Sequence, residues 1–340
     1  MLDGADAETT RLLGEVLGPA VEVFADRTPE NAAGLVDDFA ARHPDHRDAA
    51  VAIDALLKAI TYLFAASWPG WTPSRLAAYR DCRRLFDALL FALAPAAGAS
   101  VERLRVTVDG DEVVAYALFP PGGAPMPAVL ISNGLEGTIE EALLPVLRFR
   151  DAGLAVVAME MPGTFAYRKP LSPQSEDVYT AVIDHLASHP RIDPDRLGMV
   201  GLSFGAHWST RVAARDGRLK AVVSNGGLYH RSFQPAATFG MPEIMLWTLQ
   251  RTTGATSSLD LARKLGALSL KHLYREIAIP VLAINGDSDT LVSTQDTVDL
   301  AEQAPLGQLR LYSDDDHCAM GHYTEWLDDT LGWLKQQLEA

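Results

Sequence analysis

The hydrophobic pattern from residue 101 to the end of the chain alternates between two periodicities. Short apolar runs predict strands at 104–108, 113–119, 128–132, 154–159, 197–200, 221–224, 281–285 and 309–312. Apolar residues at helical spacing predict helices at 140–150, 176–188, 206–214 and 323–338. Asp109-Gly110-Asp111 is a turn signal, so the first two strands should form an antiparallel pair. Strands that alternate with helices are typical of an α/β fold with a mostly parallel, doubly wound sheet.

The chain before residue 99 has a helical pattern instead. Two apolar stripes at helical spacing are Val51, Ala55, Leu56, Ala59, Ile60 and Leu63, and then Leu76, Tyr79, Leu85, Leu89 and Leu93. The segment 68–73, rich in Trp and Pro, separates the two helices, and the segment 94–99 is typical of a joint. We therefore expect an N-terminal helical domain at 1–98 and an α/β core at 99–340. A minimal core does not need such a prefix, so it is either a cap over the site or a dimerisation element.

The alternation is interrupted again after the strand at 221–224. An insertion at about 230–278 contains two apolar, helical segments, one with Met241, Met245 and Trp247 and another at 259–268. Insertions at this place often cover the site, and we expect a lid here. The alternative is a pair of surface helices, because methionines and aromatic side chains also pack ordinary cores.

The sequence Gly201-Leu202-Ser203-Phe204-Gly205 carries the clearest chemical signal. It lies between a predicted buried strand and a predicted helix, which is the context of the nucleophile elbow of α/β-hydrolases. The two glycines leave room for the strand and helix backbones to approach each other closely. Ser203 is expected in a strained conformation, with its hydroxyl exposed above the sheet.

The partners that such a serine needs follow in the expected order. Asp289 lies in a polar loop after the strand at 281–285, and His317 follows the last predicted strand. His317 would take the proton of Ser203 while Asp289 holds the imidazole tautomer. Asp287 competes with Asp289, which we favour because Gly-x-x-Asp followed by Thr-Leu-Val resembles the acid loop of many hydrolases. Each has a plainer alternative, since Asp289 is also suited to capping a loop and His317 to a surface position.

The loop Asn133-Gly134-Leu135-Glu136 after the third strand is expected to complete the site. An oxyanion hole needs two amides, and we expect them from Phe204 and Leu135. A carboxylate at Glu136 would oppose the developing negative charge. Glu136 therefore either points away and pairs structurally, or is used chemically as an acid, a base or a contact to a substrate hydroxyl.

Composition narrows the class of partner. The chain has 340 residues, 48% of them hydrophobic and 21% charged, and a formal charge of −15, which disfavours nucleic acid and anionic membranes. The acidic start has no signal-peptide pattern, and no uninterrupted apolar run is long enough to span a membrane. Cys82 and Cys318 are far apart and show no metal spacing. We expect a cytoplasmic protein that needs no metal and no organic cofactor.

The residues from Asn133 through Met161-Pro162-Gly163 to the Ser203 elbow, preceded by the helical prefix, resemble one group of α/β-hydrolases. This is the dihydroxypseudooxynicotine hydrolase group, with polyketide-shortening hydrolases and fermentation-respiration-switch esterase-like proteins. The resemblance implies that the prefix caps the site. It also implies that Glu136, at the matching position, assists cleavage of a carbon–carbon bond beside a carbonyl. The chain departs from the group by having Asn133-Gly134 where Gly-Gly is common.

These observations predict a serine hydrolase that acts on a small carbonyl-bearing molecule. The bond would be an ester or a C–C bond beside a ketone, for example in a polyketide or another natural-product intermediate. Two alternatives stay open: elimination of an acyloxy group such as acetate, with His317 removing a carbon-bound proton, and a non-catalytic binding or regulatory protein. Tyr229 is a candidate polar contact to the substrate or else a core tyrosine. If the prefix does not cover the site, a homodimer is its expected role.

Overall fold

The computed structural model describes residues 34–68, 72–96, 98–135, 137–139, 152–165, 169–238 and 241–339. These residues fall into two compact units. The predicted helix at 140–150 lies outside the described residues.

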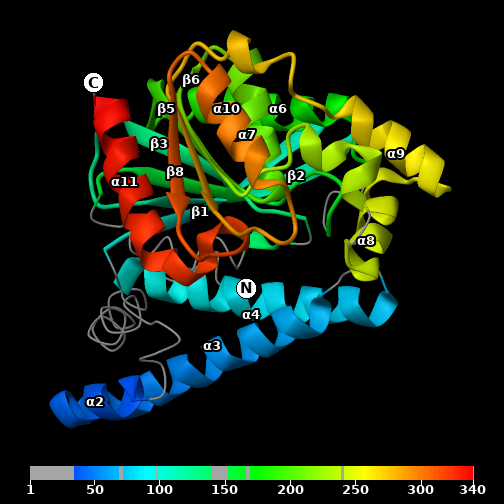
Figure 1. Cartoon of the computed structure of the whole chain (residues 1–340). Coiled ribbons are helices and arrows are strands. Elements are labelled where there is room, and N and C mark those ends of the chain that lie inside the picture. Colours follow the sequence, from blue (N-terminus) through cyan, green and yellow to red (C-terminus); the bar gives the residue numbers. More distant parts are fainter. Residues whose placement is uncertain are drawn as a thin grey trace. The chain divides into compact units, whose positions relative to one another are not determined.

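Most of an eight-stranded sheet lies in the second unit (Figure 1). Its strands are β1 (Ser100–Val108), β2 (Asp111–Phe119), β3 (Met126–Ser132), β4 (Ala155–Met159), β5 (Ile192–Leu202), β6 (Leu219–Asn225), β7 (Val281–Gly286) and β8 (Gly307–Tyr312). Their order across the sheet is β1-β2-β4-β3-β5-β6-β7-β8, and the pairs from β4 to β8 are parallel. A two-residue turn at Asp109 and Gly110 joins β1 to β2, a connection that only antiparallel neighbours can make. The predicted fold class, a mostly parallel sheet of the α/β type, is confirmed.

The burial of the strands explains why apolar runs in the sequence predicted them. Every residue of β3, β4 and β7 is buried, as expected for strands covered on both faces. Strand β8 lies at the edge of the sheet, and of its residues only Tyr312 is buried. Strand β5 begins five residues before its predicted start because it includes the polar segment at 193–196, where its register with β3 shifts.

Helices cover both faces of this sheet. They are α6 (Glu176–Ala187), α7 (Phe204–Arg215), α10 (Thr294–Gln303) and α11 (Tyr323–Glu339). Helices α7 and α11 both pack on β5 and β6, from opposite faces (Figure 1). The sheet is therefore doubly wound, and its C-terminal edge is the place where α/β proteins bind ligands.

The insertion between β6 and β7 contains α8 (Glu243–Thr253) and α9 (Ser258–Ala267). Its first residues are held by the carboxylate of Asp296 on α10. This carboxylate accepts hydrogen bonds from the backbone N–H groups of Tyr229, His230, Arg231 and Ser232. Asp296 is fully buried, so the start of the insertion is fixed to the core of the second unit.

The first unit contains α2 (Leu35–Arg42), α3 (Arg47–Ser67) and α4 (Pro73–Ala96). The two long predicted helices are present, but the apolar stripe read from the sequence is not the most buried face of α3. Of that stripe only Ile60 is buried, whereas Val51 is 47% exposed. The buried residues of α3 are instead Ala50, Ile53, Asp54, Leu57, Ile60 and Ser67. Apolar residues surround this helix almost completely, so periodicity alone does not define the packed face. That the prefix caps the site stays a prediction.

One segment of the first unit is unusually apolar for its length. By length and composition, Pro44–Ser67 could cross a membrane: its most apolar window has a mean hydropathy of 1.7, and 28% of that window is buried. The apolar run is not uninterrupted, as the sequence shows, because it contains Asp54 and Lys58, which pair with each other. Core helices pass the same test, so the finding is a weak indication.

Candidate active site

Ser203 lies at a sharp turn between β5 and α7. Its backbone has φ 53° and ψ −120°, a conformation that side-chain-bearing residues rarely adopt. A Cβ on Gly201 would overlap the carbonyl of Gly205, and a Cβ on Gly205 would overlap the carbonyl of Ser132. The N–H of Ser203 donates to the carbonyl of Asn225 at 2.7 Å. Steric crowding thus requires the two glycines, and the turn is anchored to β6.

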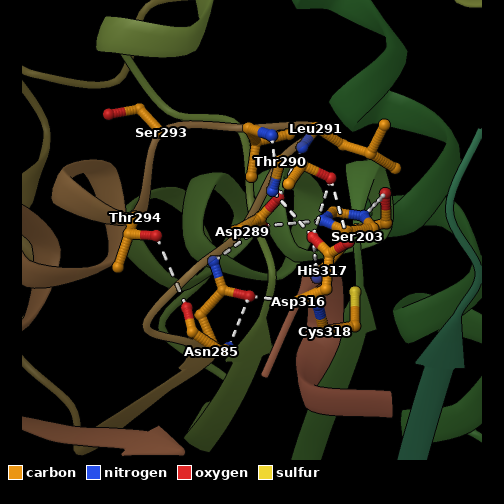
Figure 2. A network of polar contacts seen from close by, with 12 residues as sticks. Ser203, Asn285, Asp289, Thr290, Leu291, Ser293, Thr294, Asp316, His317 and Cys318 are labelled. Carbon is orange, nitrogen blue, oxygen red and sulfur yellow. Dashed lines mark hydrogen bonds and ion pairs between the residues drawn. The ribbon is translucent and has the colours of Figure 1, made fainter. Parts of the chain in front are cut away.

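His317 links Ser203 to Asp289 (Figure 2). Its Nε2 lies 2.8 Å from Ser203 Oγ, and its Nδ1 lies 2.8 Å from Asp289 Oδ2. The three residues follow β5, β7 and β8, whose parallel C-terminal ends meet at one edge of the sheet. Asp287, the competing acid, instead accepts hydrogen bonds from the Ser288 hydroxyl and the N–H of Asp314. The geometry therefore selects Asp289 as the partner of His317.

The carboxylate of Asp289 is completely buried and fully hydrogen-bonded. Its Oδ1 accepts from the N–H groups of Leu291 at 2.8 Å and Val292 at 2.9 Å. Its Oδ2 accepts from His317 and, at 2.8 Å, from Asn285 Nδ2. Burial alone would raise the pKa of Asp289, but the contacts with His317, Val292 and Asn285 outweigh it and hold this pKa below its usual value. Asp289 is thus a permanently charged partner for the imidazole.

The pKa of His317 is shifted in the opposite direction. Burial of the ring disfavours its charged form. The adjacent Cys318 side chain and the Asp289 carboxylate favour it more strongly, so the pKa of His317 lies above its ordinary value. The charged, protonated form of the ring is therefore stabilised at this position.

Two buried asparagines, which sequence analysis did not identify, hold the histidine loop. Asn285 Oδ1 accepts from the N–H of Cys318 at 3.0 Å, so this side chain binds both the acid and the histidine loop. Asn225 Nδ2 donates to the carbonyl of Cys318 at 3.0 Å from the other side. Cys318 and Ala319 both have positive φ, a conformation that needs such support. The signal in the sequence is weak: each asparagine stands at or near the end of an apolar strand.

Asp316 joins the same two loops at the surface. Its Oδ1 accepts from the N–H of Thr290 at 2.7 Å and from the N–H of His317 at 2.8 Å (Figure 2). The Thr290 hydroxyl adds a bond of 2.9 Å to the other oxygen. The acid and the histidine are therefore fixed relative to each other by backbone as well as side-chain contacts.

The loop after β3 lies against the serine. A Cβ on Gly134 would be 2.7 Å from Ser203 Cβ, so only glycine allows this approach. Leu135 lines the pocket beside Ser203. Phe204 is the first residue of α7, where the backbone N–H has no acceptor within the helix. Glu136 lies outside the described residues, so its predicted role stays a prediction.

Tyr229 and His207 lie in the core of the second unit. Tyr229 is fully buried with its ring edge-on to Tyr274, and it is not among the residues that line the pocket. His207 is also fully buried, with Nδ1 3.0 Å from the carbonyl of Leu228, and burial lowers its pKa to about 3. His207 is a packing residue, and Tyr229 occupies the position of a core tyrosine.

The pocket beside the serine is almost entirely apolar. It is lined by Leu135, Ser203, Phe204, Leu228, Met241, Met245, Leu249, Leu291, Val292 and His317. Three of these residues come from the insertion, two from the loop that carries Asp289 and one from the loop after β3. Among the described residues, no group of three or more His, Cys, Asp or Glu side chains is arranged to hold a metal ion.

A doubly wound sheet with a strained serine at the turn after β5 and a histidine after the last strand defines an α/β-hydrolase. The chain belongs to the FrsA-like esterase family, whose model matches residues 32–339. It is therefore an enzyme of the hydrolase class, and the resemblance inferred from the Ser203 elbow and its flanking loops is confirmed.

Curated relatives of known name share the sequence at modest identity. The 2,6-dihydropseudooxynicotine hydrolase of Paenarthrobacter nicotinovorans is 29% identical over 251 residues, which cover 70% of this chain and 67% of that protein. Esterase FrsA of Photobacterium profundum is 28% identical over 298 residues, which cover 82% of this chain and 70% of that protein.

Solved structures share the fold. AbyA5 superposes with a TM-score of 0.74 at 24% identity, covering 83% of this chain and 79% of that one. The 2,6-dihydroxy-pseudo-oxynicotine hydrolase superposes with a TM-score of 0.73 at 22% identity, covering 99% of this chain and 94% of that one. At these identities the likeness establishes the fold alone.

Proposed function

We propose that this enzyme is a serine hydrolase that cleaves a small carbonyl-bearing molecule, with Ser203 as nucleophile. The observation that carries the proposal is the position of His317, 2.8 Å from both Ser203 Oγ and Asp289 Oδ2. A serine hydroxyl is a weak nucleophile at neutral pH and needs an adjacent base that a third group orients. The apolar pocket beside Ser203 suits a small organic substrate.

In the first half of the reaction, Ser203 Oγ bonds to the carbonyl carbon while its proton passes to His317 Nε2. The carbonyl oxygen becomes an oxyanion, and we assign its stabilisation to the N–H groups of Phe204 and Leu135. The oxyanion then re-forms the carbonyl and expels the leaving group, which takes the proton from His317. Asp289 stays charged throughout and stabilises the imidazolium.

In the second half, His317 takes a proton from water as the water oxygen bonds to the acyl carbon. Collapse of this intermediate releases the carboxylic acid and returns the proton to Ser203. Every step uses groups of this chain and needs no metal or organic cofactor. We expect the enzyme to work in the cytoplasm.

An ester is the substrate class that this arrangement serves most simply. Cleavage of a C–C bond beside a ketone needs an additional group to protonate or stabilise the departing carbon, and Glu136 is our candidate for it. A Glu136→Gln variant distinguishes ester hydrolysis from C–C cleavage, because it should leave the rate of ester hydrolysis unchanged and slow C–C cleavage. Polyketides and other natural-product intermediates are the ketones that we would test first.

Elimination of an acyloxy group is the competing reaction on the same residues. There His317 would remove a carbon-bound proton, and no water oxygen would enter the products. Turnover in heavy-oxygen water distinguishes them, because hydrolysis places a solvent oxygen in the acid product. Absence of that label from the acid would favour elimination.

The test of the nucleophile is a Ser203→Ala variant assayed on the best ester found for the wild type. We expect kcat/KM to fall by at least about a thousandfold, as in other enzymes with this arrangement. A variant that kept full activity would refute the assignment.

A further inference from the structure

A substrate group that enters the pocket contacts mainly the hydrocarbon and thioether side chains that line it. Apart from Ser203 and His317, none of the residues that line the described pocket has a side chain that forms strong hydrogen bonds or carries charge. The Leu291 and Val292 N–H groups are already bound to Asp289. A polar or charged substituent placed here would lose its water and find no partner among the described residues that line the pocket.

One wall of this pocket is a row of side chains from the insertion. Met241, Met245 and Leu249 are spaced four residues apart, which places the last two on one face of α8. Leu249 is 2% exposed, whereas Ile244 is 37% exposed and does not line the pocket. Met245 and Leu249 therefore form the inner face of α8, and Met241 extends this wall just before the helix begins.

The helix that carries this row is fixed in place. The carbonyl of Thr252 accepts from the N–H of Leu171 at 2.8 Å, and Lys264 Nζ donates to the carbonyls of Thr253 and Gly254 at the end of α8. Asp296 anchors the start of the insertion through four backbone N–H groups. The wall can therefore define a pocket of set depth, while the two methionines retain flexible ends that adapt to branched or bent chains.

We propose that Met241, Met245 and Leu249 determine specificity, and that they select substrates whose acyl group is an uncharged hydrocarbon chain. Met245, in the middle of the row, limits the length of that chain. This inference rests on the proposed function, because it assumes that the acyl carbon bonds to Ser203. A methylene in an apolar pocket changes kcat/KM by about tenfold or more, so a truncated wall has a measurable effect.

The experiment measures kcat/KM for p-nitrophenyl esters from acetate to decanoate. For Met245→Ala we expect the ratio of the longest to the shortest ester to rise by about tenfold or more, and for Met245→Phe to fall. Met241→Ala should move the ratio in the same direction as Met245→Ala, which provides a second variant if one does not fold. Ile244→Ala removes an apolar side chain from the same helix outside the pocket and should leave the ratio unchanged.

A second arm tests the charge of the acyl group. The p-nitrophenyl monoester of adipic acid should be hydrolysed at least about a hundredfold more slowly than the hexanoate ester, because its carboxylate finds no partner among the described residues that line the pocket. Equal rates for the two esters, or an unchanged length ratio in all three methionine variants, would overturn the inference. Ser203→Ala reports separately on the proposed function: if it still hydrolyses these esters, the nucleophile assignment fails, whatever the methionine variants show.

Discussion

The proton that leaves Ser203 can move to His317 only while Nε2 of the ring is unprotonated. Because the pKa of His317 lies above its ordinary value, the neutral ring is lost as the pH falls through this raised value. We predict that kcat/KM declines on the acidic side with a midpoint above about 6.5, the value of an unperturbed imidazole. A pH profile of kcat/KM for a neutral ester measures this midpoint.

The control for this profile is Asp289→Asn. Removing the negative charge destabilises the imidazolium, so the midpoint should move to lower pH. The rate at the plateau should fall by about ten-thousandfold, because the amide also favours the wrong tautomer. An identical midpoint in the wild type and the variant would contradict the role given to Asp289.

Asn285 is predicted to position the acid and the histidine together. Asn285→Ala removes the donor to Asp289 Oδ2 and the acceptor for the Cys318 N–H. We expect kcat to fall by roughly a hundredfold with a much smaller change in KM, since a small misplacement of catalytic groups has effects of this size. The midpoint of the pH profile should also shift. A variant that loses stability but keeps kcat and the midpoint would show that Asn285 is structural only.

At this scale the sequence proposed Ser203, Asp289 and His317 together because of their order and their places after predicted strands, and the structure places the His317 ring within hydrogen-bond distance of the other two side chains. It did not identify Asn285 or Asn225. A buried asparagine at a strand end has no spacing rule, and its partners come from loops that are distant in the chain. In the sequence, only the short Gly-x-x-Asp-Thr-Leu-Val pattern favoured Asp289 over Asp287. In the structure their hydrogen bonds distinguish them, because Asp289 binds His317 whereas Asp287 accepts from the N–H of Asp314.

Among the elements, the start of the insertion is anchored by a buried carboxylate, that of Asp296. Asp296→Ala would leave the N–H groups of Tyr229, His230, Arg231 and Ser232 without their acceptor. We predict a loss of about 3 kcal/mol or more in the free energy of unfolding, since each unsatisfied buried amide is costly. Denaturant titration measures it.

Asp299→Asn is the matched control on the same helix. Asp299 pairs with Arg231, whose side chain is half exposed, and such a pair contributes at most about 1 kcal/mol. Equal destabilisation of the two variants would contradict the anchoring role of Asp296.

The elements differ in how far their sequences determine them. Strands β3, β4 and β7 are apolar runs with every residue buried, so the pattern identifies each of them directly. The packed face of α3 was not predictable, because apolar residues lie on nearly all sides of it, and among the described elements its packing against α2 and α4 determines which of them are buried. Helix α8 lies between these two cases. The sequence showed that it contains apolar residues, but it did not show which of them line the pocket.

At the scale of the whole molecule, the N-terminal helices are predicted to cap the site. If α3 and α4 cap the site, a bulky phosphonate bound covalently to Ser203 should slow hydrogen–deuterium exchange of amides in residues 47–96. Helix α11, on the other face of the sheet from α7, is the internal control and should not change. Protection confined to the insertion and the loops around Ser203 would favour a homodimer through the prefix instead.

The central claim is that Ser203 forms a covalent intermediate with help from His317. Incubation with a fluorophosphonate, followed by peptide mapping by mass spectrometry, tests it most directly. We predict one adduct per chain, located on Ser203, and a rate of labelling that falls by orders of magnitude in His317→Ala. An intact protein that does not react, or an adduct that persists in Ser203→Ala, would contradict this account.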